Sequence, residues 1–261
     1  MSDHGRMHAP GPDVADEMAP SESIGPGQAA PAHGHRRVTS FRARRSTISD
    51  RQQAIWDERW PQLGTEARHG DSPAPQLDTD AWFGRQAPLI LEIGCGTGTS
   101  TLAMAQAEPD LDVVAVEVYR RGLAQLLSAI DRAGVTNIRL VRGDGVDVLT
   151  HMVGPDSLTG VRVFFPDPWP KARHHKRRLL QADTMALIAD RLRPGGVLHA
   201  ATDHLGYAEH IAEVGDAEPR LRRIDRDTAE LPISVARPVT KYERKALAGP
   251  IVTELLWERI P

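Results

Sequence analysis

The sequence predicts an α/β protein with a mostly parallel sheet that is covered by helices on both faces. Two observations predict this class. Short apolar runs alternate with segments of helical periodicity from residue 88 onward, and the runs are almost continuously apolar, as strands buried on both faces must be. Parallel strands also need crossover connections, which the intervening helical segments can supply.

The expected elements alternate along the chain. The expected strands are residues 89–93, 113–116, 138–141, 161–165, 197–201 and 251–260. The last of these runs alternates between apolar and polar residues, which is typical of an edge strand. The expected helices are residues 100–107, 120–133 and 179–192, and the third ends at a Pro-Gly-Gly sequence that breaks helices.

The chain divides into three expected parts. Residues 1–35 are rich in Pro, Gly, Ala and His and poor in large apolar side chains, so we expect a disordered tail. Residues 36–87 are expected to form an arm, with five arginines in its first ten residues, a helix over 48–60 and a loop over 64–80. Residues 88–261 are expected to form the main domain.

Composition narrows the class of protein. The chain has 261 residues, 40% of them hydrophobic, which suffices for a buried core. Its single cysteine excludes an internal disulfide and fits a reducing cytoplasm. We expect no membrane partner, because the sequence has no run of about 18 apolar residues and no secretion signal at its start. The net charge of -3 does not indicate nucleic acid, so such a partner must be recognised from local clusters.

A glycine-rich loop follows the first expected strand. The sequence Glu92-Ile93-Gly94-Cys95-Gly96-Thr97-Gly98 places glycines at alternate positions, where the backbone can turn tightly and a ligand can approach it. The dinucleotide-binding fingerprint would require a further glycine where Thr99 stands, so that fingerprint is not met. The glycines could also merely close a turn between a strand and a helix.

Acidic residues occur at the carboxyl ends of three successive strands. Ligands of open parallel sheets bind at this edge, and Glu92, Glu117 and Asp144 are expected there. Glu117 is placed to accept hydrogen bonds from a ribose diol, and Asp144 from an adenine amino group. Carboxylates attract a cationic donor and repel pyrophosphate, which favours S-adenosylmethionine over a nicotinamide cofactor. The expected cofactor residues are Glu92, Gly94, Gly96, Glu117 and Asp144.

The fourth expected strand runs into an acid, an aromatic ring and a basic run. Asp167 lies between two prolines, which stiffen the backbone and hold its carboxylate at the carboxyl edge of the sheet. Trp169 offers a flat face on which an unpaired base could stack. Residues 171–178 contain five Lys or Arg and two His, a density typical of a phosphate-binding patch. Such a run can equally be a solvated loop, although the rigid aspartate before it favours a functional role.

The segment from Phe165 to Arg178 resembles a family signature. It reads Phe-x-Asp-Pro-Trp-x-Lys-x-x-His-x-Lys-Arg-Arg, which is similar to the signature of bacterial tRNA (guanine-N7)-methyltransferases. Further matches are Glu92, Glu117, Asp144, Thr202-Asp203 and Thr240-Lys241-Tyr242-Glu243. The resemblance extends from about residue 37 to the C-terminus. The tail before it departs from the family, as does Tyr242, where Phe is common.

The resemblance implies a fold, a reaction and a set of contacts. The fold is the Rossmann-like fold of class I S-adenosylmethionine-dependent methyltransferases, with a mostly parallel seven-stranded sheet, and the product is 7-methylguanosine at position 46 of tRNA, in the variable loop. The implied cofactor contacts are Glu92, Glu117, Asp144 and Asp167. The implied substrate contacts are Lys171, Asp203, Thr240, Lys241, Tyr242 and Glu243. The implied RNA contacts are Arg173, His174, His175, Lys176, Arg177 and Arg178. No metal is implied, and the chain is expected to be a monomer or a homodimer.

Several alternatives remain open at this stage. Taken without the resemblance, Asp203 could cap the helix that follows it, and residues 240–243 could be an ordinary loop. A methyltransferase that acts on another RNA or on a protein, or an RNA-binding relative without catalysis, would share much of this pattern. Within the favoured reaction, Asp167 is the expected catalytic residue, because a carboxylate can stabilise the positive charge that guanine acquires when N7 is methylated.

Overall fold

The computed structural model describes residues 47–227, 230–238 and 251–261. The tail expected over residues 1–35 lies outside the described residues. The same holds for the arginines of residues 36–45 and for the segment from Thr240 to Glu243.

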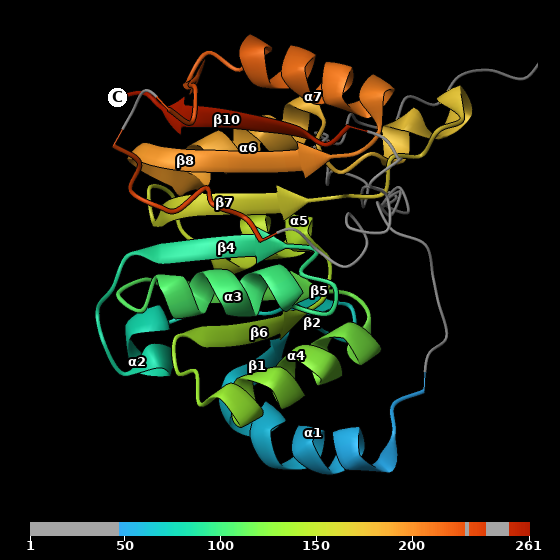
Figure 1. Ribbon diagram of the computed structural model, residues 1–261, viewed down its shortest axis with the longest axis vertical. Helices are drawn as coiled ribbons and strands as arrows, with labels where there is room; N and C mark the ends of the chain where they lie inside the picture. Colours follow the sequence, from blue (N-terminus) through green and yellow to red (C-terminus); the bar gives the residue numbers. More distant parts are fainter. Residues whose placement is uncertain (1–46, 228–229, 239–250) are drawn as a thin grey trace, which may run out of the picture. The chain divides into compact units, whose positions relative to one another are not determined.

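An eight-stranded sheet organises the described chain (Figure 1). In spatial order its strands are β1 (Gly64–Glu66), β6 (Ile138–Arg142), β5 (Asp112–Glu117), β4 (Leu89–Ile93), β7 (Leu158–Phe164), β8 (Leu192–Thr202), β10 (Thr253–Arg259) and β9 (Leu221–Arg223). The first six strands in this order are parallel to one another, whereas β10 is antiparallel to both β8 and β9. The expected mostly parallel sheet is confirmed, with eight strands in place of seven.

Two sequence-based predictions about the sheet are wrong. The run over residues 251–260 is not an edge strand, because β10 pairs with β8 on one side and with β9 on the other. The expected loop over residues 64–80 contains β1, a hairpin and the start of a short helix. The hairpin and helix are β2 (Arg68–His69), β3 (Ser72–Pro73) and α2 (Thr79–Phe83). Elements of two to five residues are too short to show a hydrophobic period.

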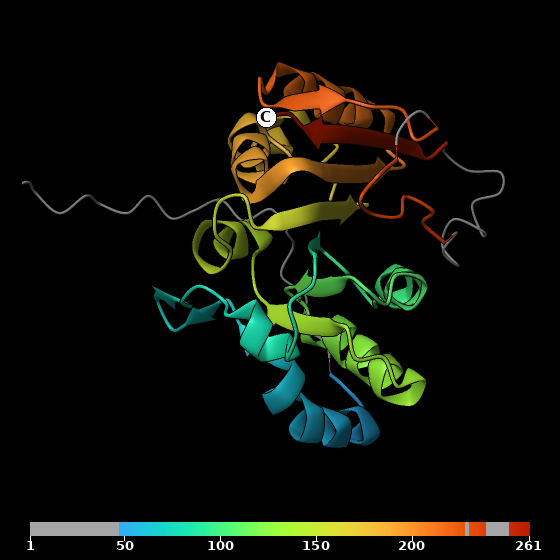
Figure 2. The ribbon, with the colours of Figure 1, turned by 90° about the vertical axis from the view of Figure 1, so that its left-hand side faces the viewer.

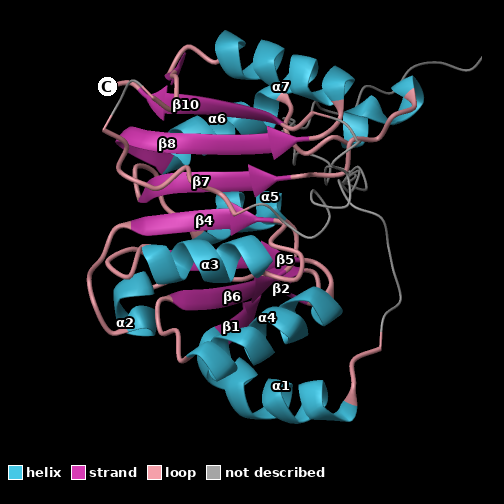
Figure 3. Cartoon of the chain, in the orientation of Figure 1, coloured by secondary structure: helices cyan, strands magenta, loops and turns pink. Residues whose placement is uncertain are grey.

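Helices cover both faces of the sheet (Figure 2). One face carries α1 (Asp50–Leu63), α3 (Thr99–Ala107) and α4 (Arg120–Ala133), and the other carries the π-helix η1 (Val148–Met152), α6 (Ala182–Arg191) and α7 (Leu205–Ala217). Short helices α5 (Gly145–Asp147) and η2 (Ala172–Arg177) lie in connections, as Figure 3 shows for α5. Alternate residues of β5 point into two separate cores, Val113 and Ala115 into one and Val114 and Val116 into the other, as a strand buried on both faces requires.

Helix α1 belongs to the same compact unit as the sheet. It begins at a capping box in which Ser49 and Gln52 bond each other's backbone N–H groups. Trp56 is buried and stacks on Trp60, with ring centroids 4.1 Å apart, while the guanidinium of Arg120 on α4 lies 4.7 Å from the Trp56 ring centroid. The helix that the sequence predicts over residues 48–60 is thus present, and it packs against α4.

A segment without helix or strand covers the sheet beside α3. Residues 230–238, which we call the cover segment, cross in front of β7 and β4 in Figure 1, in orange-red. Ile233 is buried there, and a β-carbon at Gly160 of β7 would lie 2.8 Å from its side chain. The glycine therefore makes room for the cover segment on the face of the sheet.

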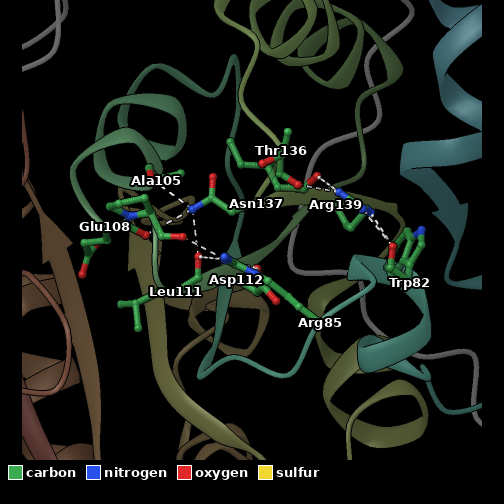
Figure 4. A network of polar contacts seen from close by, with 11 residues as sticks. Trp82, Arg85, Ala105, Glu108, Leu111, Asp112, Thr136, Asn137 and Arg139 are labelled. Carbon is green, nitrogen blue, oxygen red and sulfur yellow. Dashed lines mark hydrogen bonds and ion pairs between the residues drawn. The ribbon is translucent and has the colours of Figure 1, made fainter.

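The amino ends of β5 and β6 are closed by a polar network (Figure 4). The side-chain nitrogen of Asn137 donates to three carbonyl oxygens at and beyond the end of α3, those of Ala105, Glu108 and Leu111, over 2.8–3.1 Å. Arg85 donates twice to Asp112, over 3.0 and 2.7 Å. These contacts satisfy carbonyls that the end of a helix leaves unpaired, so this edge of the sheet has a structural role.

Candidate active site

A pocket opens at the opposite edge of the sheet, where β4, β5, β6 and β7 end. Its lining comes from the last residues of these strands and from the residues that follow them, together with Leu179, which lies between η2 and α6. The lining residues are Ile93, Gly94, Val116, Glu117, Val118, Tyr119, Gly143, Asp144, Gly145, Phe164, Phe165, Pro166, Asp167 and Leu179. The carboxyl ends of parallel strands thus meet at one site, as expected for an open α/β sheet.

The glycine loop adopts a backbone that other residues avoid. Gly94, Gly96 and Gly98 have φ angles of 79°, 58° and 74°, in the left-handed region. A fourth glycine, Gly122 on α4, lies against the loop, because a β-carbon there would stand 2.3 Å from the carbonyl oxygen of Gly96. The sequence prediction missed Gly122, although a glycine inside a helical pattern can signal such a close approach.

Glu117 joins the glycine loop to the end of β5. One of its oxygens accepts a hydrogen bond from the N–H of Gly96 over 2.9 Å, and the other accepts from Val118 and Tyr119 over 2.7 and 3.0 Å. Burial raises the pKa of Glu117, the three N–H donors oppose this, and the charge of Asp167 adds to it. A cation bound in the pocket would relieve the repulsion between the two carboxylates.

Asp144 lies at the end of β6 and also lines the pocket. Its carboxylate accepts a hydrogen bond from the N–H of Val146 over 3.0 Å and caps α5. The neighbouring Gly145 carries no side chain because a β-carbon would meet Ile93 of β4 at 2.3 Å. The orientation of the Asp144 side chain therefore depends on its hydrogen bond to α5 and on the close packing of α5 against β4.

Glu92 does not line the pocket with the other acids. Its side chain is buried between β4 and α3, where one oxygen accepts from the hydroxyl of Thr101 over 2.9 Å. The other oxygen has no hydrogen-bond partner in the described part of the chain. Burial raises the pKa of Glu92, and the charge of Arg162 opposes this rise. Of the acids expected at this edge, only Glu117, Asp144 and Asp167 reach the pocket surface.

The segment that carries Asp167 is held between two strained residues. Phe165 and Trp169 have φ angles of 51° and 44°, in the left-handed region that bulky side chains avoid. Such residues cost about 1–3 kcal/mol each and persist only where the surrounding structure determines them. Together with Pro166 and Pro168, they hold Asp167 at the pocket, as the sequence predicted.

The prediction that the ring of Trp169 offers a free face for a stacked base is wrong. The ring is buried, and the guanidinium of Arg177 lies 4.7 Å from its centroid, with the ring of His174 at 5.9 Å. A base that stacks on this ring would first have to displace these neighbours. Trp169 therefore acts as the packing centre of the basic segment, residues 171–178.

The basic segment divides into exposed and buried residues. Lys171, Arg173 and Lys176 are exposed, and His174, His175 and Arg177 are half-buried. Arg178 is buried: its guanidinium donates to the carbonyl oxygens of Pro168 and Gly206 over 2.9 and 3.2 Å and lies 4.8 Å from the ring centroid of Tyr207. Its donors therefore anchor the segment to α7, and the expected RNA contact at Arg178 does not fit its burial.

Asp203 follows β8 at the same edge of the sheet and is half-buried. The alternative that it caps α7 is wrong, because the cap is His204, whose Nδ1 accepts from the N–H of Tyr207 over 3.2 Å. Asp203 is thus available for another role. Thr240 to Glu243, which were also expected to contact the substrate, lie outside the described residues.

The charges of the pocket indicate the kind of ligand that it accepts. Among the described lining residues three are acidic and none is basic, so the pocket favours a cation over a phosphate.

No group of three metal-ligating side chains occurs within residues 47–227, 230–238 and 251–261. In the same part of the chain no helix is long and apolar enough to cross a bilayer.

A Rossmann-like sheet of this order, with a glycine loop and an acidic pocket suited to a cationic nucleoside, defines a class I S-adenosylmethionine-dependent methyltransferase. Residues 86–250 match the family model described as a putative methyltransferase. The chain is 77% identical over 269 residues to the tRNA (guanine-N(7)-)-methyltransferase of Mycolicibacterium gilvum, with 100% of each chain covered. It is 62% identical over 262 residues to the enzyme of that name from Mycobacterium tuberculosis, with 99% of this chain and 96% of the relative covered. The chain belongs to the tRNA (guanine-N(7)-)-methyltransferase family.

Similarity to solved structures is weaker. The antibiotic-resistance methyltransferase Kmr aligns with a TM-score of 0.49 and 15% identity, over 74% of this chain and 98% of that one. The aminoglycoside resistance methyltransferase NpmB1 aligns with a TM-score of 0.46 and 13% identity, over 74% of this chain and 98% of that one.

Proposed function

We propose that this chain transfers the methyl group of S-adenosylmethionine to N7 of a guanine in tRNA. One observation carries the proposal: three carboxylates that follow three different strands line a single pocket, and the chain runs from one of them, Asp167, into the basic segment with its exposed Lys171, Arg173 and Lys176. The relatives that are 62–77% identical bear the name of this activity. The signature resembles that of enzymes that modify position 46, in the variable loop, which supports this guanine as the target. The single cysteine supports the cytoplasm as the place of the reaction.

The donor fits the residues of the pocket. Bound S-adenosylmethionine would supply an electrophilic methyl group on a positively charged sulfur. Glu117 would accept hydrogen bonds from its ribose hydroxyls and Asp144 from its adenine amino group, and the glycine loop would let the backbone approach it. Glu92 is buried on β4 behind the pocket, and in its ionised form it would add to the attraction for a cation.

Methylation of guanine N7 does not require the protein to remove a proton. N7 has a free lone pair and no proton, so the reaction needs no general base. Catalysis can then rest on the placement of N7 in line with the methyl group. The methylated ring becomes positively charged, and Asp167 stabilises this charge as it develops. Asp167 or Asp203 also accepts from the N1–H and the amino group of guanine, a donor pair that adenine lacks.

The exposed cations beside Asp167 bind the RNA backbone. Lys171, Arg173 and Lys176 carry this role, with the half-buried His174, His175 and Arg177 at their side. N7 lies in the deep groove of an RNA helix, which side chains cannot enter. The target guanine must therefore be accessible in a loop or at a junction.

The reaction is tested by incubating the purified chain with the donor and bulk tRNA and mapping 7-methylguanosine. We expect methyl transfer to a single guanine of the variable loop. Ribosomal RNA, DNA and protein serve as parallel substrates in the same assay. Transfer to one of these and not to tRNA would overturn the proposal.

The role of Asp167 is tested by substitution. We expect Asp167→Ala to lower kcat/KM by about 10²- to 10³-fold, the usual effect of removing one group that stabilises transition-state charge. Asp110, an exposed acid at the amino edge of the sheet, provides the control, and Asp110→Ala should leave kcat/KM unchanged. Turnover of Asp167→Ala close to that of the wild type would remove Asp167 from the chemistry.

A further inference from the structure

The cover segment lies on the sheet without secondary structure of its own, so its backbone groups need hydrogen-bond partners from elsewhere in the chain. Backbone N–H and C=O groups placed over an apolar sheet must find hydrogen bonds. Two charged residues supply them at Ser234: Glu108 accepts from its N–H over 2.5 Å, and Arg162 donates to its carbonyl oxygen over 3.0 Å. Arg162 has no exposed surface and pairs with Glu108 over 2.6 Å. The middle of the cover segment is therefore fixed by a buried ion pair.

A second buried set holds the end of the cover segment. Glu254 on β10 bonds His199 on β8 with one oxygen, over 3.0 Å, and accepts from Arg237 with the other, over 3.2 Å. Burial lowers the pKa of His199, so its ring is neutral near neutral pH and donates to Glu254 as an N–H group. The side chain of Arg237 is only 3% exposed. Arg237 is thus held in one place by the sheet itself.

The guanidinium of Arg237 lies against the wall of the pocket. It stands 4.9 Å from the ring centroid of Phe165 and 5.6 Å from that of Phe164, and both of these residues line the pocket. Phe165 is the strained residue two positions before Asp167. A planar cation stacked on its ring is the kind of contact that can hold such a conformation.

We propose that Arg237 is a positioning residue, which fixes Phe165 and thereby the Asp167 carboxylate against the methyl-transfer site. The proposal rests on the function proposed above, because it assigns Asp167 the role given there. It explains why a buried histidine, the half-buried Glu254 and a buried arginine are placed next to the pocket. It also assigns the cover segment a part in catalysis in addition to its part in covering the core.

The test compares Arg237→Ala, Arg237→Lys and a matched control. Arg222 on β9 is exposed and pairs with Glu258 of β10 over 2.6 Å, so Arg222→Ala removes an arginine that does not touch the cover segment and serves as the control. We expect Arg237→Ala to lower kcat by about 10- to 100-fold, as a small misplacement of a catalytic group does, with KM for tRNA changed less than about twofold. Arg222→Ala should retain the kcat of the wild type.

A second measurement separates positioning from general stability. S-adenosylhomocysteine lacks the positive charge of the donor. The affinity for S-adenosylmethionine divided by the affinity for S-adenosylhomocysteine therefore reports how closely the carboxylates approach the sulfur. We expect this ratio to be lower in Arg237→Ala than in the wild type. Arg237→Lys retains the charge beside Glu254 but not the planar group, so we expect it to remain as slow as the alanine variant. Assays run well below the Tm of each variant, and the lysine variant carries the test should the alanine variant not fold.

The outcomes distinguish the two proposals. If the wild type does not methylate tRNA, the proposed function fails, while the ratio of donor affinities still measures whether Arg237 positions the carboxylate. If the wild type methylates tRNA and Arg237→Ala keeps both its kcat and its affinity ratio, the positioning role is overturned. Recovery of full activity in Arg237→Lys would overturn the stacking that the role requires.

Discussion

At the scale of one residue, the burial of Glu92 lowers the stability of the fold at a position behind the donor pocket. Its carboxylate is buried against α3, one oxygen has no hydrogen-bond partner among the described residues, and burial raises its pKa. The folded chain therefore holds this proton more tightly than the unfolded chain does. The free energy of unfolding falls as pH rises from the ordinary pKa of a glutamate through the raised pKa of Glu92. Above the ordinary pKa of a glutamate, the burial of Glu92 therefore makes the fold less stable than it is at acidic pH.

Replacing Glu92 should stabilise the protein and weaken donor binding. In Glu92→Gln the amide keeps an acceptor for Thr101 and carries no charge, so we expect a higher Tm at pH 7.5, by about 2–4 °C for each kcal/mol gained, and no difference near pH 4. Affinity for S-adenosylmethionine should fall. Thermal melts at both pH values and calorimetry measure the two effects, with the exposed Glu209→Gln as the control. A lower Tm at pH 7.5 would contradict this account of the buried charge.

At the scale of elements, the contact between α4 and the glycine loop determines the shape of the donor site. Glycine inside a helix usually costs stability relative to alanine, by roughly 0.5–1 kcal/mol. At Gly122 this preference reverses, because a β-carbon would stand 2.3 Å from the carbonyl oxygen of Gly96. The N–H of Gly96 is also bonded by Glu117, so a shift of the loop would move a cofactor residue.

Adding a methyl group at Gly122 should therefore damage the donor site. Overpacking of this kind costs about 1–3 kcal/mol, so we expect Gly122→Ala to weaken donor binding by roughly 10- to 100-fold. Calorimetric titration with S-adenosylhomocysteine measures it. The neighbouring Arg121 is exposed on the same turn, and Arg121→Ala should bind as the wild type does. Unchanged affinity in Gly122→Ala would show that α4 can move without affecting the loop.

At the scale of the whole molecule, the distribution of charge matters more than the total. The formal net charge is -3, yet Lys171, Arg173 and Lys176 are exposed together beside the pocket. The acidic pocket attracts a cationic donor while this neighbouring surface attracts a polyanion. The buried Arg178 belongs to the fold and not to this surface.

Removing the exposed cations should change how RNA binding depends on salt. We expect the triple variant Lys171→Gln, Arg173→Gln and Lys176→Gln to bind tRNA more weakly. The slope of log affinity against log salt should become less steep by about 0.7–0.9 for each phosphate that the variant no longer neutralises. Titrations at several salt concentrations measure this slope. Arg193, exposed at the amino end of β8, provides the control variant Arg193→Gln. An unchanged slope in the triple variant would make the basic segment an ordinary solvated loop.

The local chemistry of the chain determined most elements and most of the acidic site. Helix α4 and strand β4 were predicted at their observed bounds, because hydrophobic period and glycine positions are local signals. Glu117, Asp144 and Asp167 were predicted at one edge because parallel strands place their carboxyl ends together. The signature from residue 165 to residue 178 sufficed to predict the family, which the relatives confirm.

Only the tertiary structure decided which of these residues face the pocket and which are enclosed. Trp169 was expected to offer a surface for stacking, but it is buried beside His174 and Arg177. Arg178 was expected to contact RNA, but Gly206 and Tyr207, far along the chain, enclose its guanidinium. The contact of Gly122 with the glycine loop and the stacking of Arg237 on Phe165 have the same origin. Burial is a property of what packs against a side chain, and the packing partners come from sequence positions that no local pattern relates. The sequence determines the chemical groups present, and packing determines which of them a substrate can reach.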